Sequence, residues 1–180
     1  MTPTNSEDIL DAGIRLRTPR PEEGSALWQL AHDTGTLDLN SGYLYLLLAR
    51  DFADTCVVAE QDGVIVGFAT GYRRPRYPEV IFLWQVAIHP DFQGQGLGKQ
   101  LVAGFLRQPG ADRASILETT ISPDNAASRG LFEAIARELD VDCRVSPLFA
   151  SEDFPEPTHE PEELFSIGPF RPAALNQLAL

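Results

Sequence analysis

Three glycines follow one another at every second position in the stretch HPDFQGQGLGKQL, residues 89–101, directly after an apolar and β-branched run over residues 80–88. The run predicts a strand buried on both faces. From the last glycines onward, Leu97, Leu101 and Phe105 have helical spacing. A strand, a glycine-rich turn and a helix N-terminus together present backbone N–H groups to a phosphate. The chain is therefore constrained to a β-loop-α unit whose turn lets a phosphate-bearing ligand approach the backbone.

The spacing of these glycines is G-x-G-x-G, from Gly94 to Gly98. A dinucleotide-binding turn has G-x-G-x-x-G after the first strand and an acidic residue about 20 residues later. A P-loop needs a G-x-x-x-x-G-K-[ST] motif, which the sequence lacks. The remaining alternative is a flexible loop that holds three glycines by chance. The residues on both sides of the turn argue against that alternative.

The rest of the chain alternates predicted strands and helices. Strands are expected at residues 14–17, 55–60, 64–72, 80–88, 116–121, 143–145 and near 164–167. Helices are expected from residue 21 to about 31, over 43–52 and 96–107, and from a cap at 122–124 to about 139. Asp62-Gly63 indicates a tight hairpin turn. This order predicts an α/β fold with a mixed, mostly antiparallel sheet flanked by helices.

Length and composition set further bounds. The 180 residues predict a single domain over residues 14–170, with flexible tails at 1–13 and 171–180. The net charge of −12 argues against nucleic acid or an anionic membrane as a partner and suits a cationic ligand. Two cysteines disfavour a disulfide scaffold and indicate reduced thiols in a cytoplasmic protein. No signal peptide or membrane span is visible.

The glycine turn carries a family pattern. VAIHPDFQGQGLGKQL resembles motif A of the GNAT acetyltransferases, which is Q/R-x-x-G-x-G/A after a strand that ends in His-Pro, with Gln93, Gly96 and Gly98 at the motif positions. Downstream, NAASRGLFEAI resembles the second element of the family, N-x-x-A-x-x-L-Y, with Asn125 first. The chain departs from this element at Phe132, where the family usually has tyrosine. The resemblance implies acetyl-CoA as the co-substrate.

Three longer blocks, residues 32–60, 82–101 and 144–170, are similar to a group within the family that acetylates a small diamino acid. This similarity implies the GNAT fold, splayed between the fourth and fifth expected strands, transfer of acetyl to the 4-amino group of the substrate, and a homodimer. Two alternatives stay open. One is a GNAT enzyme for another small diamine, a polyamine or a protein N-terminus, and the other is an acyl-CoA-binding module that has lost catalysis.

The resemblance also implies residues for acetyl-CoA and for catalysis. Acetyl-CoA is expected on one strand edge, where the pantetheine arm lies in the splay, and on the turn that receives the pyrophosphate. These residues are Val86, Ile88, Gln93, Gly94, Gln95, Gly96, Leu97, Gly98, Lys99 and Asn125. The Val86 N–H is the candidate donor to the oxyanion of the reaction. Because phenylalanine cannot donate a proton, Ser128 is a candidate proton source for the departing thiolate.

A substrate with two ammonium groups and one carboxylate calls for acidic side chains in its pocket. The candidates are Asp33, Asp38, Asn40, Tyr43, Trp84, His159, Glu160 and Glu162. Other interpretations stay open: Asp33 or Asn40 caps a helix, Trp84 belongs to the core, and the glutamates lie in a solvated loop. No metal is expected, because His159 has no helical H-x-x-x-H or Cys/His ligand set beside it.

Overall fold

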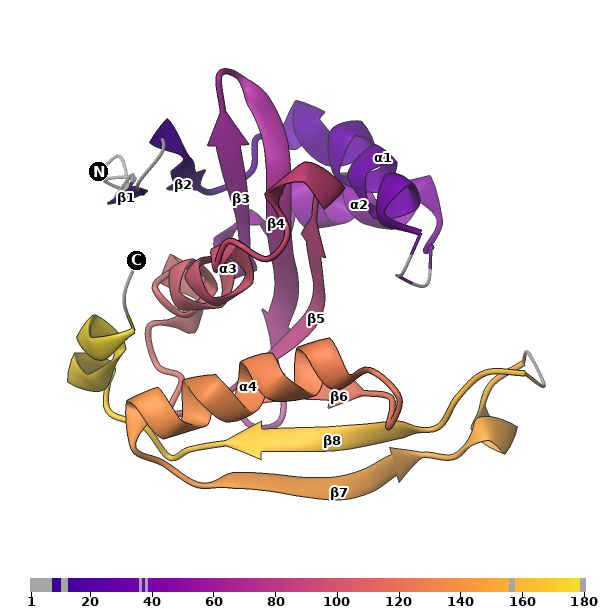
Figure 1. The fold of residues 1–180 in the computed structure, drawn as a ribbon, viewed down its shortest axis with the longest axis vertical. Helices are drawn as coiled ribbons and strands as arrows, with labels where there is room; N and C mark the ends of the chain where they lie inside the picture. Colours follow the sequence, from indigo (N-terminus) through magenta and orange to yellow (C-terminus); the bar gives the residue numbers. More distant parts are fainter. Residues whose placement is uncertain (1–7, 11–12, 36, 38, 156–157, 179–180) are drawn as a thin grey trace.

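The structure is a computed structural model, and it describes residues 8–10, 13–35, 37, 39–155 and 158–178. These residues form one sheet in the order β1-β2-β3-β4-β5-β6-β8-β7, with helices on both faces (Figure 1). The strands are β1 (Asp8–Ile9), β2 (Arg15–Arg17), β3 (Cys56–Gln61), β4 (Val64–Arg73), β5 (Val80–Ile88), β6 (Ile116–Ile121), β7 (Cys143–Phe149) and β8 (Glu162–Ile167). The α-helices are α1 (Gly24–Thr34), α2 (Gly42–Arg50), α3 (Leu97–Leu106) and α4 (Ala126–Leu139).

The sheet opens between β5 and β6, its one parallel pair among the described strands. The two strands pair only from Val80–Ile116 to Phe82–Glu118. Beyond this point β5 continues to Ile88 and β6 to Ile121, but the two strands no longer pair with each other, so they diverge. The expected splay between the fourth and fifth predicted strands is thus confirmed. All other neighbouring strands pair antiparallel, as the sequence predicted.

Helices bury both faces of the sheet. On one face, Leu101 and Phe105 of α3 and Ile135 of α4 belong to the core that contains Ile81 and Leu83 of β5. On the other face, α1 and α2 pack on β3, β4 and β5 in a second core (Figure 1). The apolar spacing that predicted α3 therefore does mark its buried face. Within the described residues, no helix is long and apolar enough to cross a membrane.

A buried ionic network fixes the start of α1. Arg17 in β2 is 4% exposed and donates hydrogen bonds to both Glu23 and Glu60. The pKa of Glu60 is lowered because Arg17 and Arg15 donate to its carboxylate. Breaking a buried pair of this kind is strongly destabilising. Because Glu23 is the N-cap residue of α1, the network anchors this helix to β2 and β3.

The described parts of both expected tails are ordered. Asp8–Ile9 forms β1 and pairs with β2, and Leu10 is buried. At the other end, Pro172–Gln177 forms a 3-10 helix and Leu178 is buried. Arg107 donates to the carbonyl oxygens of Leu175 and Leu178, which satisfies these two carbonyls. Residues 171–178 are thus packed, and the expectation of a tail there was wrong.

Three predicted boundaries or environments also need correction. β7 extends to Phe149 because its pairing with β8 continues to Glu162. The N-cap of α4 is Asn125, whose side chain accepts the Ser128 N–H, and not a residue of the 122–124 segment. β5 is buried on both faces only in its first half, since Trp84 is 40% exposed where the sheet opens.

Candidate active site

A cleft of about 980 Å³ lies where β5 and β6 diverge. Its walls come from the second half of β5, the end of β6, the start of α4, the loop after α1 and the segment before β8. Backbone groups on the β5 edge that faces the gap have no β6 partner there, because the β5–β6 pairing ends at Phe82. Such an edge can form strand-like hydrogen bonds with an extended ligand.

The glycine turn lies between β5 and α3, beside one end of the cleft. Gly94 and Gly96 have φ values of +72° and +84°, a region that disfavours side chains. Gly96 is the N-cap of α3. A Cβ at either position would have no protein atom within 4 Å, so the space above this backbone is open. Positive φ and an open approach to a helix N-terminus are what a phosphate site requires.

The residues expected to hold acetyl-CoA fall into two sets. Val86, Ile88, Gln93, Gly98 and Asn125 line the cleft. The others continue the turn or the first turn of α3 outside the cleft wall, and they are Gly94, Gln95, Gly96, Leu97 and Lys99. Within this second set, the Leu97 side chain is buried in the core, and Lys99 Nζ pairs with Glu138 at 3.0 Å. At these two positions a phosphate can therefore reach the backbone groups, and it can reach the Lys99 ammonium only if that side chain leaves Glu138.

The start of α4 forms the opposite wall. Asn125 Oδ1 accepts the Ser128 N–H at 3.0 Å, which fixes the first turn of the helix. Ser128, Leu131 and Phe132 line the cleft from this helix. Phe132 is 3% exposed and belongs to the core, so its ring is held rigidly at the wall. Of the two positions discussed for a proton donor, only Ser128 carries a hydroxyl.

Five of the residues expected to bind substrate line the same cleft: Asn40, Trp84, His159, Glu160 and Glu162. The His159 ring stacks on Phe154, with 3.6 Å between ring centroids. His159 Nδ1 lies 2.6 Å from the Glu160 carbonyl oxygen, and because a carbonyl only accepts, this nitrogen carries the hydrogen. The described residues that line the cleft include three carboxylates and no lysine or arginine. The cleft therefore suits a cationic ligand.

Two expected substrate residues do not line the cleft, and a third cannot be placed. Asp33 is exposed on α1 outside the cleft wall, where it bonds His32 and Gln29. The pKa of Asp33 is lowered by these hydrogen bonds, that with His32 first. The Tyr43 side chain is 69% exposed and is not part of the cleft wall. Asp38 lies outside the described residues.

Sequence reasoning missed part of the wall. Thr119 and Thr120 at the end of β6 line the cleft, as do Phe154 and Thr158 from the segment before β8. The signal for the threonines was the polar run Glu118-Thr119-Thr120 inside a predicted strand, because strands of a buried sheet are mostly apolar. Phe154 and Thr158 gave no such signal, because their contact with the cleft depends on how the segment folds back.

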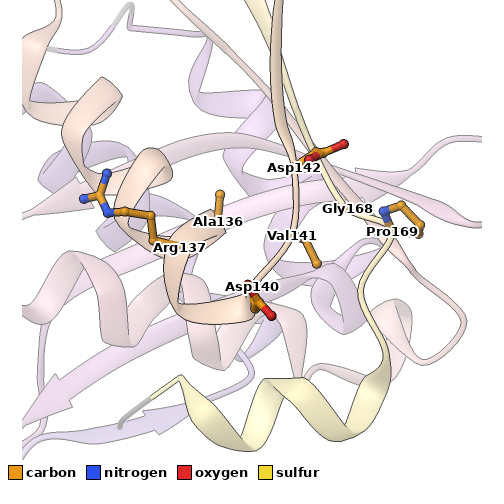
Figure 2. Close-up of a pocket in the computed structure, with 7 residues that line it drawn as sticks. All are labelled: Ala136, Arg137, Asp140, Val141, Asp142, Gly168 and Pro169. Atoms are coloured by element: carbon orange, nitrogen blue, oxygen red, sulfur yellow. The ribbon is translucent and has the colours of Figure 1, made fainter.

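A second, smaller hollow of about 470 Å³ lies at the other end of α4 (Figure 2). Arg137, Asp140 and Asp142 surround it together with the Gly168-Pro169 turn. None of its residues lines the large cleft or belongs to the two family motifs at residues 86–101 and 125–135. In the part of the chain that the structure describes, no group of three or more His, Cys, Asp or Glu side chains could hold a metal ion.

Comparisons with known proteins agree with this geometry. Residues 22–136 match the family model of the acetyltransferase (GNAT) family. The L-2,4-diaminobutyric acid acetyltransferase of Streptomyces coelicolor is 46% identical over 160 residues, which are 88% of this chain and 94% of that protein. The enzyme of the same name from Virgibacillus pantothenticus is 39% identical over 86% of this chain and 98% of its own length.

A solved structure resembles the whole fold. The diaminobutyrate acetyltransferase of Paenibacillus lautus, in complex with L-2,4-diaminobutyric acid and coenzyme A, superposes with a TM-score of 0.84 at 44% identity. The match covers 88% of this chain and 96% of that one. The chain belongs to the GNAT acetyltransferase family and, within it, to the L-2,4-diaminobutyric acid acetyltransferases.

Proposed function

We propose that this protein transfers the acetyl group of acetyl-CoA to the 4-amino group of L-2,4-diaminobutyrate, giving 4-acetamido-2-aminobutanoate and coenzyme A, a step of ectoine synthesis. The observation that carries the proposal is the cleft, where an unpaired strand edge and a glycine turn meet a wall that bears Glu160 and Glu162. One end suits a pantetheine and its phosphates, and the other suits an ammonium-bearing substrate. The relatives described above carry the same activity in their names.

The reaction begins with a neutral amine. An ammonium has no lone pair, and an alkylamine with a pKa near ~10.4 costs roughly 4–5 kcal/mol to deprotonate at pH 7. Glu160 and Glu162 orient the ammonium-bearing substrate through charge, while the neutral form of the 4-amino group attacks the thioester carbon. The proton goes to water or to a base in the cleft. Trp84 adds an exposed aromatic face for cation–π contact with an ammonium.

The transition state needs a donor for the oxyanion and a proton for the thiolate. The Val86 N–H lies on the diverging half of β5, where the thioester carbonyl would lie alongside the strand. The Ser128 hydroxyl at the facing wall is our candidate relay: it passes a proton to the coenzyme A thiolate and takes up the proton that the attacking nitrogen loses as the amide forms. Coenzyme A is a fair leaving group, because its thiol pKa is near that of cysteine, ~8.5.

A substrate panel tests the proposal. Acetyl-CoA turnover should be highest with 2,4-diaminobutyrate and much weaker with ornithine, with simple diamines and with polyamines. Preference for a polyamine or a peptide N-terminus would indicate a different amine acceptor within the family. If acetyl-CoA binds in calorimetry but none of these amines is acetylated, the chain is a binding module and the proposed activity is wrong.

Replacing Phe132 by tyrosine should leave kcat within about twofold of the wild type. The ring is buried at the cleft wall, so a new hydroxyl gains little and crowds the site. General acid catalysis contributes ~10²–10⁴-fold where it operates. A rise of that size in kcat, measured over the pH range in which the substrate amine titrates, would contradict the assignment of Ser128 as proton source.

We propose further that the protein is a homodimer that uses the free edge of β7, and that it works in the cytoplasm. β7 is the last strand of the sheet, and Val145, Leu148 and Phe149 on it are 42%, 38% and 47% exposed. Exposed apolar edge strands are normally covered. The free thiols Cys56 and Cys143 are compatible with a reducing compartment.

A charged residue introduced on β7 tests the proposed dimer interface. Val145→Lys should shift the mass measured by sedimentation from dimer to monomer. Val64→Lys is the matched control, because Val64 is 63% exposed at the start of β4 and should leave the mass unchanged. A wild-type monomer, or a dimer that survives Val145→Lys, would contradict this interface.

A further inference from the structure

An irregularity in β5 lies directly beside the cleft. Thr70 of β4 is opposite Gln85, but the next residue, Gly71, is opposite Leu83, so Trp84 is an extra residue in β5. Gly71 is required here, because a Cβ would lie 2.1 Å from the Phe82 carbonyl oxygen. An extra residue of this kind forms a β-bulge, which redirects the side chains that follow it.

The packing on either side shows this redirection. Leu83 belongs to the core under α3, and Val86, three residues later, packs against the same core. In an unbroken strand, residues three apart point to opposite faces. Leu83 and Ala87, four residues apart, would share a face in an unbroken strand, yet Ala87 lies in the second core, under α1 and α2. The bulge therefore decides which way Trp84 and the Val86 backbone are presented to the cleft.

A buried hydrogen bond holds the residue after the bulge. The hydroxyl of Tyr45 in α2 donates to Gln85 Oε1 at 3.0 Å, with Tyr45 fully buried and Gln85 5% exposed. The Tyr45 ring also packs edge-on against Phe68 of β4, with 6.3 Å between centroids. A buried amide is costly to leave without its partner, so this bond fixes the Gln85 side chain toward α2.

We propose that Tyr45 and Gln85 act as positioning residues that hold the β5 bulge and thereby set the orientation of Trp84 and of the Val86 N–H. The inference rests on the proposed function for the roles of those two groups. It goes beyond that function by assigning a part in catalysis to α2, whose Tyr45 is fully buried and does not line the cleft. When the Tyr45–Gln85 hydrogen bond is lost, the bulge can relax, and Trp84 and the Val86 N–H move by fractions of an ångström.

The test uses Tyr45→Phe, which removes one oxygen and keeps the ring. We expect kcat to fall on the order of tenfold to a hundredfold, the size typical of small misplacements, while the KM for acetyl-CoA stays within about threefold. The sequence holds two tryptophans, so Trp28→Phe leaves Trp84 as the only indole reporter. In that background, Tyr45→Phe should shift the Trp84 emission maximum and change its quenching by acrylamide.

Thr70→Val is the matched control. Thr70 is opposite Gln85 in the neighbouring strand and is fully buried, and among the described residues its hydroxyl has no hydrogen-bond partner. Thr70→Val removes a buried hydroxyl next to Gln85 without breaking a hydrogen bond. We therefore expect kcat and Trp84 emission to stay at wild-type values. If Tyr45→Phe does not fold, Gln85→Met takes its place, because it removes the other partner of the same bond.

The proposal is overturned if Tyr45→Phe or Gln85→Met keeps both kcat and Trp84 emission, or if Thr70→Val reproduces their losses. Trp84 emission needs no amine substrate. If the wild type does not acetylate diaminobutyrate, the proposed function fails, while the emission change still decides whether Tyr45 and Gln85 hold the bulge.

Discussion

Glu162→Gln should raise the KM for diaminobutyrate strongly and leave the KM for acetyl-CoA near the wild-type value. Glu162 lines the cleft, whose described wall residues include no lysine or arginine. Losing one partner of a desolvated ion pair costs roughly 2–5 kcal/mol, which is a loss of about 30-fold or more in kcat/KM for the amine. Steady-state kinetics with each substrate varied in turn measures the split.

Asp33→Asn is the control for this prediction. Asp33 is also an acidic residue from a sequence block that resembles the family, but it lies on α1 outside the cleft wall and already bonds His32 and Gln29. Its neutralisation removes the same charge from the protein without touching the cleft. Equal effects of Glu162→Gln and Asp33→Asn would mean that overall charge matters and that Glu162 does not contact the substrate.

Local patterns were sufficient for the unit that makes the cofactor half of the site. The apolar run at 80–88, the glycines and the spacing of Leu97, Leu101 and Phe105 predicted β5, the turn and α3 correctly. Each of these features depends on near neighbours in the chain, such as helical periodicity and the φ preference of glycine. The resemblance to a family then supplied the splay, which the β5–β6 register confirms.

Features that depend on distant contacts were harder to predict. Asp33 and Glu162 looked equivalent as acidic residues in distinctive blocks, yet only Glu162 reaches the cleft. The length of β7 depends on its partner β8, and the packing of residues 171–178 depends on Arg107, the residue that follows α3. The extra residue at Trp84 appears only when β4 and β5 are aligned. Contacts between residues far apart in the sequence cannot be predicted from local sequence patterns.

Gly96→Val should lower acetyl-CoA affinity at least tenfold, about 1.4 kcal/mol or more. Gly96 has φ +84° and is the N-cap of α3, where a β-branched residue is strained. No protein atom lies within 4 Å of the position that a Cβ would occupy there, so the added methyl groups would project into the space that a phosphate needs. Isothermal calorimetry with acetyl-CoA measures the change, and circular dichroism checks that the fold is intact.

Gly63→Val separates strain from ligand contact in this test. Gly63 has φ +82° in the hairpin between β3 and β4, and a Cβ there also meets no atom within 4 Å. The backbone strain is therefore matched, while the hairpin is not part of the cleft wall. Both variants should lose similar thermal stability, but only Gly96→Val should lose acetyl-CoA binding. If affinity falls equally in both, strain explains the loss; if Gly96→Val binds normally, the glycine turn does not hold the cofactor. Because the two substitutions differ mainly in what lies above the backbone, the comparison reports directly on the phosphate site.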